Sequence, residues 1–311
     1  MITTVTLNPM LDKTVRVRRV TIGQITRADA VASIVGGKGV NVARQLHRLG
    51  CGVRATGIWG GEVGSQLDRL LTEERIPHDF LRIAGMTREG VTYLDSDGVM
   101  TSVFEPPHVV TENEAKALVS HCRGFLSSSS WMVCCGSSPG AASDSAYADL
   151  MRHARASGVR TALDTYGEPL RLALDTIPDL VKVNREEYQN TIGVTLDAES
   201  HIVDALLALV EHGVGLAVLT DGPRPCYAAS PSGCWRIAPP PVSCVNPTGS
   251  GDSMMAGILY GLSRGWDAPK SVSFGAAAGA ANAAVWDVSA ASMEDVMALL
   301  PRMSIVELDF S

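Results

Sequence analysis

Residues 246–265 read NPTGSGDSMMAGILYGLSRG, and this stretch carries the most information about the fold and function of the 311-residue chain. A glycine-rich turn precedes an apolar helical stripe that consists of Met254, Met255, Ile258, Leu259 and Leu262. Gly249 and Gly251 permit backbone conformations that other residues resist, so successive amides can converge on an anion at the positive end of the helix. The stretch therefore predicts an anion-binding turn that opens a helix.

Asp252 directly follows Gly251 in this turn. A carboxylate beside an anion-binding turn is well placed to take a proton from an attacking hydroxyl. Phosphoryl transfer needs such a base together with donors that stabilise charge. The alternative is a plain N-terminal helix cap. The two flanking glycines favour the catalytic interpretation because they leave room for a ligand.

A second glycine-rich turn, GGKGVNVAR over residues 36–44, also leads into a helix. It is not a Walker A loop, because Gly39 rather than Ser or Thr follows Lys38 and the upstream glycine spacing is wrong. The bare backbone, the cation of Lys38 and the amide of Asn41 suit one small polar ligand. We interpret the segment as a binding loop, with a simple tight turn as the alternative.

Outside these turns, apolar runs of strand length alternate with helical patterns. The runs are Thr3–Leu7, Val53–Ile58, Trp131–Cys135, Thr161–Leu163, Leu180–Val183 and Leu216–Leu219. The helices expected between them include Val40–Leu49, Ser65–Glu74, Asn113–Leu126, Ser145–Ser157 and His201–His212. This alternation predicts one α/β domain over residues 1–311, built around a mainly parallel sheet. Residues 14–32 and 90–104 are short, alternating and β-rich, so we expect them to form a separate small sheet, a lid.

Composition excludes several classes of protein. With 26 Lys+Arg against 33 Asp+Glu, the net charge of −7 argues against general binding to nucleic acid or to an anionic membrane. The seven cysteines are odd in number and show no CxxC spacing, so they indicate neither a disulfide framework nor a zinc site. Because the sequence has no basic leader and no apolar run of about 18 residues, we expect a soluble, cytoplasmic protein.

Weaker candidates follow expected strands or lie at the edge of the lid. Asp12 could accept hydrogen bonds from sugar hydroxyls, although an Asp in a turn is common. Arg88 could bind a phosphate through two hydrogen bonds, with a solvated side chain as the alternative. Asn184 and Glu187 have the spacing of a capping box, yet near a nucleotide the same pair could order magnesium and its waters.

Residues 136–140 read GSSPG and match the G-x-S-x-G pattern of a hydrolase nucleophile. Pro139 argues against a serine hydrolase, because the residue after the nucleophile must donate its backbone N–H and proline has none. We interpret the segment as a turn whose Ser137 touches the substrate, with a plain loop as the alternative.

Taken together and in this order, the segments resemble the ribokinase-like (PfkB-type) carbohydrate kinases over essentially the whole chain. Residues 36–44 resemble the first signature of that family, and Pro247–Gly257 resembles the second. The phosphosugar branch contains 1-phosphofructokinase, tagatose-6-phosphate kinase and the minor 6-phosphofructokinase. The segments more similar to this branch are Asn8-Pro9 with Leu11-Asp12, Thr87-Arg88, Gly136-Ser137 and the NPTGSGD turn.

The resemblance implies a Rossmann-like three-layer α/β/α fold with a β-sheet lid, a homodimer joined through the lids, and ATP with Mg²⁺. It also implies phosphoryl transfer to a ketohexose phosphate, namely fructose 1-phosphate, tagatose 6-phosphate or fructose 6-phosphate. Glu89 places an acidic residue next to Arg88 and keeps a kinase for a free sugar or nucleoside as an alternative. A non-catalytic sugar-phosphate binder is a further alternative, although a binder would not need Asp252.

The resemblance also implies roles for individual residues. Asp252 would be the catalytic base, and the amides of Gly249, Ser250 and Gly251 would stabilise the transferring group. The sugar would contact Asp12, Gly37, Lys38 and Asn41, while Arg88 and Ser137 would hold its existing phosphate. ATP would involve Asn184 and Glu187, which would bind magnesium through water, together with Thr220, Gly222 and Asn282.

Overall fold

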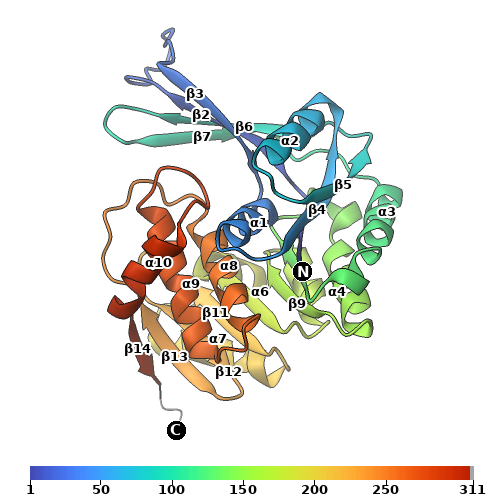
Figure 1. Cartoon of the computed structure of the whole chain (residues 1–311), viewed down its shortest axis with the longest axis vertical. Helices are drawn as coiled ribbons and strands as arrows, with labels where there is room; N and C mark the ends of the chain where they lie inside the picture. The colour runs from blue at the N-terminus through green and yellow to red at the C-terminus, as the bar shows by residue number, and fades with distance from the viewer. Residues whose placement is uncertain (309–311) are drawn as a thin grey trace.

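The computed structural model describes residues 1–308, and Figure 1 shows a large sheet flanked by helices with a smaller sheet projecting from one end. The parallel strands of the large sheet are β1 (Ile2–Thr6), β4 (Val53–Gly60), β5 (His78–Ile83), β8 (Trp131–Cys135), β9 (Arg160–Asp164), β10 (Leu180–Asn184) and β11 (Leu216–Thr220). They lie in the order β11-β10-β9-β8-β1-β4-β5. Each expected apolar run therefore forms a strand of one mainly parallel sheet.

Three antiparallel strands extend the sheet beyond β11: β12 (Cys226–Ser230), β13 (Gly233–Ala238) and β14 (Ser304–Glu307). The sequence analysis did not predict them. β12 and β13 mix small and polar residues with apolar ones, and β14 is exposed along its whole length, so none has the continuous apolar run that marks a strand buried on both faces.

Helices cover both faces of the large sheet and make the structure three-layered. One face is covered by α3 (Glu112–Arg123), α4 (Ala146–Ala156), α5 (Glu168–Leu174), α6 (Arg185–Ile192) and α7 (Glu199–Glu211). The other face is covered by α1 (Lys38–Arg48), α2 (Gly61–Glu73) and α8 (Ser250–Leu262). Successive strand residues enter opposite layers: Cys134 joins the first core, whereas Val133 and Cys135 join the second.

Two further helices pack behind α8. The long helix α9 (Ala268–Ala283) lies against α8, and α10 (Met293–Leu299) lies against α9. Gly257 and Gly275 permit the close approach of α8 and α9, since a Cβ on Gly257 would lie 2.7 Å from the Gly275 Cα. No helix within residues 1–308 is long and apolar enough to cross a bilayer.

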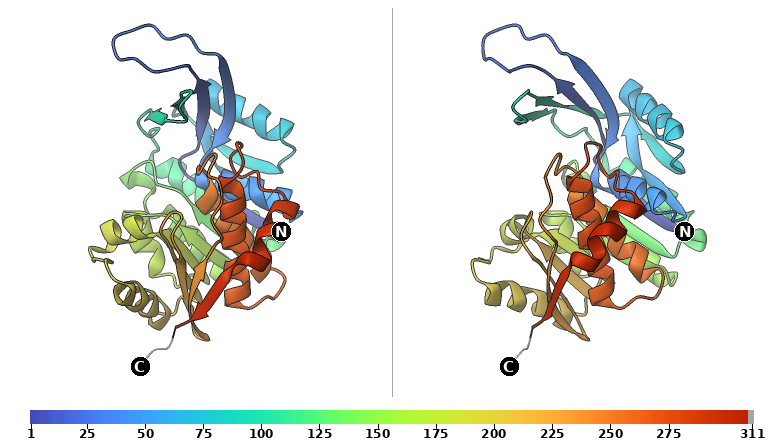
Figure 2. Two further views of the ribbon diagram at one scale, coloured as in Figure 1. Left: turned by 90° about the vertical axis from the view of Figure 1, so that its left-hand side faces the viewer. Right: turned by 60° about the vertical axis from the view of Figure 1, so that its left-hand side comes forward.

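The smaller sheet is the lid, and its strand order is β3-β2-β6-β7. Its strands are β2 (Met10–Arg16), β3 (Ala30–Gly36), β6 (Arg88–Leu94) and β7 (Met100–Phe104). The first pair of strands extends beyond the predicted segment 14–32 at both ends, and the second begins before the predicted segment 90–104 and ends with it, because pairing continues to the base of the lid at Met10, Gly36 and Arg88. Figure 2 shows the β2–β3 hairpin extending away from the main body.

Candidate active site

The predicted site residues meet where the carboxyl ends of the parallel strands face the lid. This edge of a parallel sheet is where ligands bind in α/β folds. The residues at the strand ends are Asn8 after β1, Gly136 and Ser137 after β8, Asp164 at the end of β9, Asn184 at the end of β10 and Thr220 at the end of β11. The first turns of α1 and α8 reach the same edge.

The turn before α8 has the backbone that an anion-binding loop requires. Gly249 is the N-cap with φ +78°, and a Cβ there would lie 2.6 Å from the Val288 Cγ1 atom, so a larger residue would not fit. The first amides of a helix lack partners within the helix. The Ser250 amide already donates to the Pro247 carbonyl at 3.2 Å, which leaves Gly249 and Gly251 as the better donors of the three predicted.

Asp252 is buried, at 7% exposure, and accepts a hydrogen bond from Asn41 Nδ2 at 2.8 Å. Arg44 donates to Asn41 Oδ1 at 2.8 Å, which orients the Asn41 amide so that its NH₂ group faces Asp252. Gly249 is the N-cap of α8 and Asp252 is the third residue of the helix, so Asp252 is not its N-cap. Burial raises the pKa of Asp252 to about 6, and the Asp164 carboxylate adds to this effect while Lys38 opposes it.

A charged cluster of Lys38, Asp164, Lys182 and Glu187 lies beside this turn. Asp164 bridges both ammonium groups, with Lys38 Nζ at 2.9 Å from Oδ1 and Lys182 Nζ at 2.5 Å from Oδ2. Lys38 also contacts Glu187 Oε1 at 2.7 Å. Burial alone would raise the pKa of Asp164, but the two lysines outweigh it and hold that pKa below its usual value.

The charged cluster puts cations at the anion-binding turn. A Cβ on Gly251 would lie 3.5 Å from Lys182 Nζ, so this ammonium group is adjacent to the turn. Lys38 reaches the cluster from the first turn of α1. Its neighbour Gly37 has φ +124°, and a Cβ there would lie 2.8 Å from Thr6 Cγ2, so only glycine lets α1 start this close to β1.

The capping box predicted at α6 is present. Glu187 N donates to Asn184 Oδ1 at 2.8 Å, and Asn184 N donates to Glu187 Oε2 at 3.1 Å. Both Glu187 oxygens therefore have partners, one from this box and one from Lys38. A magnesium ion bound to nucleotide phosphates typically keeps several waters. Asn184 and Glu187 are therefore suited to contact such an ion through its waters. Within residues 1–308, no three His, Cys, Asp or Glu side chains are grouped to hold a metal ion.

The remaining nucleotide candidates lie in two places. Thr220 pairs with Asn184 in the sheet, and Gly222 follows in a loop with φ +57°. Asn282 is fully buried on α9, where its amide nitrogen donates to the Thr248 carbonyl at 2.9 Å and to Ser250 Oγ at 3.1 Å. Asn282 thus braces the turn before α8.

On the lid side, polar groups are left without partners. We call Asn8, Asp12 and Arg88 the lid-side group. In residues 1–308, Asn8 Oδ1, Asp12 Oδ1 and Arg88 Nε are buried and make no hydrogen bond. Burial raises the pKa of Asp12 and lowers the pKa of Arg88. The Asn8 amide nitrogen donates to Ser137 Oγ at 3.1 Å, which brings Ser137 to the same side.

Arg88 and Glu89 point to opposite faces of the lid because they are consecutive residues in β6. Arg88 pairs in register with Met10 and so lies on the Asp12 face. Glu89 forms an ion pair with Lys13 on the other face. The acidic side chain next to Arg88 in the sequence is therefore turned away from it and neutralised.

Asp164 and Lys182 were missed by the sequence analysis. Asp164 follows an apolar run directly, which is a position at the carboxyl edge that could have been noticed. Lys182 is a single charge inside an apolar strand, and a buried lysine requires a partner. Neither signal predicts that the two would pair.

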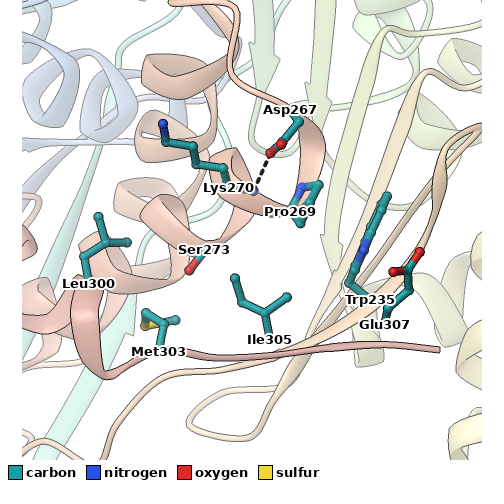
Figure 3. Close-up of a pocket in the computed structure, with 9 residues that line it drawn as sticks. All are labelled: Trp235, Asp267, Pro269, Lys270, Ser273, Leu300, Met303, Ile305 and Glu307. Atoms are coloured by element: carbon teal, nitrogen blue, oxygen red, sulfur yellow. Dashed lines mark hydrogen bonds between the residues drawn. The ribbon is translucent and has the colours of Figure 1, made fainter.

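A separate pocket of about 540 Å³ lies on the far side of the molecule, between α9, the chain at 300–303 and the β13–β14 edge (Figure 3). Its lining residues are Trp235, Asp267, Pro269, Lys270, Ser273, Leu300, Met303, Ile305 and Glu307. None of the predicted site residues is among them.

Comparison with known proteins supports one family. The profile of the pfkB family carbohydrate kinases matches residues 5–294. The chain is 32% identical over 268 residues to a 1-phosphofructokinase of Rhodobacter capsulatus, covering 86% of this chain and 85% of the relative. Two solved structures of phosphofructokinase-2 from Escherichia coli, in complex with fructose-6-phosphate and in its tetrameric inhibited form, superpose with TM-scores of 0.88 and 0.89. Both are 27% identical, with 97% of this chain and 98% of the neighbour covered.

Proposed function

Because the chain belongs to the pfkB family of carbohydrate kinases, we propose that it transfers the γ-phosphoryl group of ATP to a hydroxyl of a ketohexose phosphate. The candidate acceptors are fructose 1-phosphate, fructose 6-phosphate and tagatose 6-phosphate. The observation that carries the proposal is a buried Asp252 held beside an anion-binding turn and two ammonium groups. This pairing of a base with charge-stabilising donors is what phosphoryl transfer requires.

The base acts on the acceptor hydroxyl. Asp252 accepts its proton as the hydroxyl oxygen attacks the γ-phosphorus, and the bond from phosphorus to the bridging oxygen of ADP breaks. The raised pKa of about 6 leaves Asp252 ionised at neutral pH while keeping it a stronger base than an exposed carboxylate. Asn41 donates to Asp252 Oδ2. The other carboxylate oxygen, Oδ1, is then left to accept the proton of the acceptor hydroxyl.

The turn and the cluster stabilise the transferring group. The amides of Gly249 and Gly251 donate to phosphoryl oxygens, and the ammonium groups of Lys182 and Lys38 offset the negative charge that the phosphoryl group carries. These donors are already positioned by Asp164 and by the glycine backbone, so little reorganisation accompanies the reaction. Thr220 and Gly222 lie along the strand edge where the rest of the nucleotide extends.

Magnesium belongs to the same proposal. Glu187 and Asn184 would hold the ion through water, since their direct hydrogen-bonding positions are filled within the capping box and by Lys38. The ion would neutralise β- and γ-phosphate charge when bound with ATP.

The acceptor lies between the lid and the strand edge. Asp12, with one unpartnered oxygen, accepts hydrogen bonds from sugar hydroxyls, and Arg88 with Ser137 holds the phosphate. Because Glu89 faces away and is paired with Lys13, the main reason to favour an uncharged acceptor is removed. A bound phosphate orients the reacting hydroxyl, which is the entropic part of catalysis.

The test is MgATP consumption with each of the three sugar phosphates, with free sugars and with nucleosides. Asp252→Asn serves as the background enzyme, because its amide oxygen still accepts from Asn41. Turnover of one ketohexose phosphate by the wild type alone supports the proposal. Turnover of free sugars or nucleosides without any sugar phosphate contradicts it.

We further propose that two copies join through the lids. Several apolar lid side chains are exposed, among them Ile22, Ile25, Val31 and Val103, at 98%, 93%, 61% and 61%. Surfaces of this kind mark interaction sites. Light scattering after gel filtration should give twice the chain mass for the wild type and for the control Val194→Asp. The double variant Val31→Asp/Val103→Asp should give the mass of one chain. A wild type that also has the mass of one chain would contradict the proposal.

A further inference from the structure

His108 is the strongest unassigned feature of the molecule. It lies between β7 and α3 and is 5% exposed, and neither Nδ1 nor Nε2 has a hydrogen-bond partner in residues 1–308. A neutral imidazole has one N–H donor and one acceptor nitrogen, so this ring leaves both positions open. Buried polar groups without partners cost free energy and are rare in folded proteins. A ligand that supplies the partner accounts for this one.

The surroundings of His108 disfavour its protonated form. Burial and the Arg88 guanidinium of β6 together lower its pKa to about 4, while Glu114 of α3 has the opposite effect. The Leu7 backbone carbonyl at the end of β1 approaches the ring and raises the pKa of His108, but it does not reach hydrogen-bonding geometry with either ring nitrogen. Glu114 is already bonded to the backbone amides of Thr111 and Ala84, so it does not pair with the imidazole. Without a ligand, His108 is therefore neutral beside the Arg88 cation.

The open positions of His108 extend the lid-side group. Arg88 Nε and Asn8 Oδ1 are buried without partners, and Asn8 directly follows Leu7. The amide nitrogen of Asn8 donates a hydrogen bond to Ser137 Oγ at 3.1 Å. A guanidinium, an imidazole N–H and a hydroxyl thus surround the end of β1, and these donors together suit an anion.

We propose that His108 binds the phosphate already carried by the acceptor sugar and thereby determines the preference for phosphorylated over free sugars. The inference rests on the proposed function, since it assigns a residue to the acceptor phosphate. The imidazole donates an N–H to a phosphate oxygen, and the dianion offsets the charge of Arg88. With that charge offset, the second ring nitrogen can take up a proton.

The kinetic test uses His108→Leu, which removes both nitrogens and keeps an apolar side chain of similar size. Losing a hydrogen bond to a charged group should raise the KM for the sugar phosphate by roughly 10- to 100-fold, with a smaller change in kcat. The KM for MgATP should not change. His108→Gln, which keeps a donor, should recover part of the affinity, and His121→Leu on α3 is the matched control. Thermal unfolding of His108→Leu at or above the wild-type temperature shows that the variant folds.

The second measurement is independent of turnover. The ring nitrogens of the seven histidines are followed by NMR during pH titration, with inorganic phosphate or fructose 6-phosphate present or absent. The signals missing in His108→Leu identify His108. Either anion should raise the His108 pKa from about 4, whereas His121 should not respond.

The outcomes separate this inference from the proposed function. If the wild type phosphorylates a sugar phosphate and His108→Leu leaves its KM unchanged, the His108 assignment is overturned and the proposed function stands. If the wild type phosphorylates no sugar phosphate, the proposed function fails. In that case, a His108 pKa that does not change with inorganic phosphate overturns the anion site as well. A His108 pKa that rises with inorganic phosphate supports the anion site.

Discussion

The charged cluster and the lid-side group satisfy their polar groups in opposite ways. In the charged cluster, Asp164 binds two lysines and Glu187 uses both of its oxygens. In the lid-side group, Asn8, Asp12 and Arg88 each keep a buried atom without a partner. The cluster is complete without a ligand, whereas the lid-side group is not.

This difference separates two ways of building a binding site. A preformed arrangement of charges stabilises a transition state without reorganising, which suits the part of the site that handles the transferring phosphoryl group. Open positions cost free energy until a ligand fills them, which makes affinity depend strongly on whether the ligand has the right polar groups. Variants in the cluster should therefore affect folding and turnover, and variants in the lid-side group should affect affinity.

The largest effect is expected for Asp252→Asn, beside the charged cluster. Loss of a general base should lower kcat by roughly 10²- to 10⁴-fold, while both KM values change little. Because only the ionised carboxylate accepts a proton, the kcat/KM of the wild type should fall as the pH drops below about 6. Steady-state kinetics across pH 5–9 measures both. A variant with substantial turnover, or a wild-type profile that is flat through pH 6, would show that another group is the base.

Asp164→Asn should have the next largest effect, and on stability. Removing one partner of a buried ion pair leaves Lys182 uncompensated, and such losses cost about 3–5 kcal/mol. Asp149→Asn is the control, because its pair with Arg152 is exposed and worth about 0–1 kcal/mol. The free energy of unfolding in urea measures both. Equal values for the two variants would break the comparison, since the charged cluster would then contribute no more than a surface pair.

The stabilising contribution of Asp164 also has a defined pH dependence. Its folded pKa lies below the unfolded value of 3.8, so the contribution is complete above that value and is lost as the pH falls through the folded pKa.

Arg88→Ala should show the opposite signature to Asp164→Asn. The KM for a phosphorylated acceptor should rise by roughly 10- to 100-fold, because a charge-assisted contact is lost. Unfolding free energy should change little, since Arg88 Nε has no partner to lose. Kinetics and urea unfolding on the same preparation test both statements. Strong destabilisation with an unchanged KM would contradict the assignment of Arg88 to the ligand.

The sequence predicts much of this arrangement but not the pairings that distinguish the two regions. Local patterns suffice for the parallel strands, for the glycine turns and for the capping box of Asn184 with Glu187, because each depends on neighbouring residues. The bridge from Asp164 to Lys38 and Lys182 depends on which strands are adjacent, so it requires the β8-β9-β10 order. The hydrogen bond from the Ser250 amide to the Pro247 carbonyl depends on the geometry of the turn. The spacing of the glycines does not determine that geometry.

The lid shows the same limit at the level of single residues. Alternation predicts a small sheet, but its strands reach Met10 and Arg88 because of pairing between β2 and β6. The same register places Arg88 on the Asp12 face and Glu89 on the opposite one. In the sequence the two are adjacent charges of opposite sign, and nothing local says which of them faces the ligand.

The smallest effect is expected for Glu89→Gln, and its smallness is informative. Glu89 and Lys13 are about one-third exposed, and pairs of this kind contribute about 0–1 kcal/mol to stability. Because the Glu89 carboxylate faces away from Arg88, removing its charge should change the KM for a sugar phosphate by less than about twofold. If Glu89 instead stood beside the bound phosphate, removing the like charge would lower that KM severalfold, an effect that high salt would not erase in a buried site. Measuring the KM of Glu89→Gln and wild type at low and high salt therefore tests whether the lid-side group presents only positive charge to its ligand.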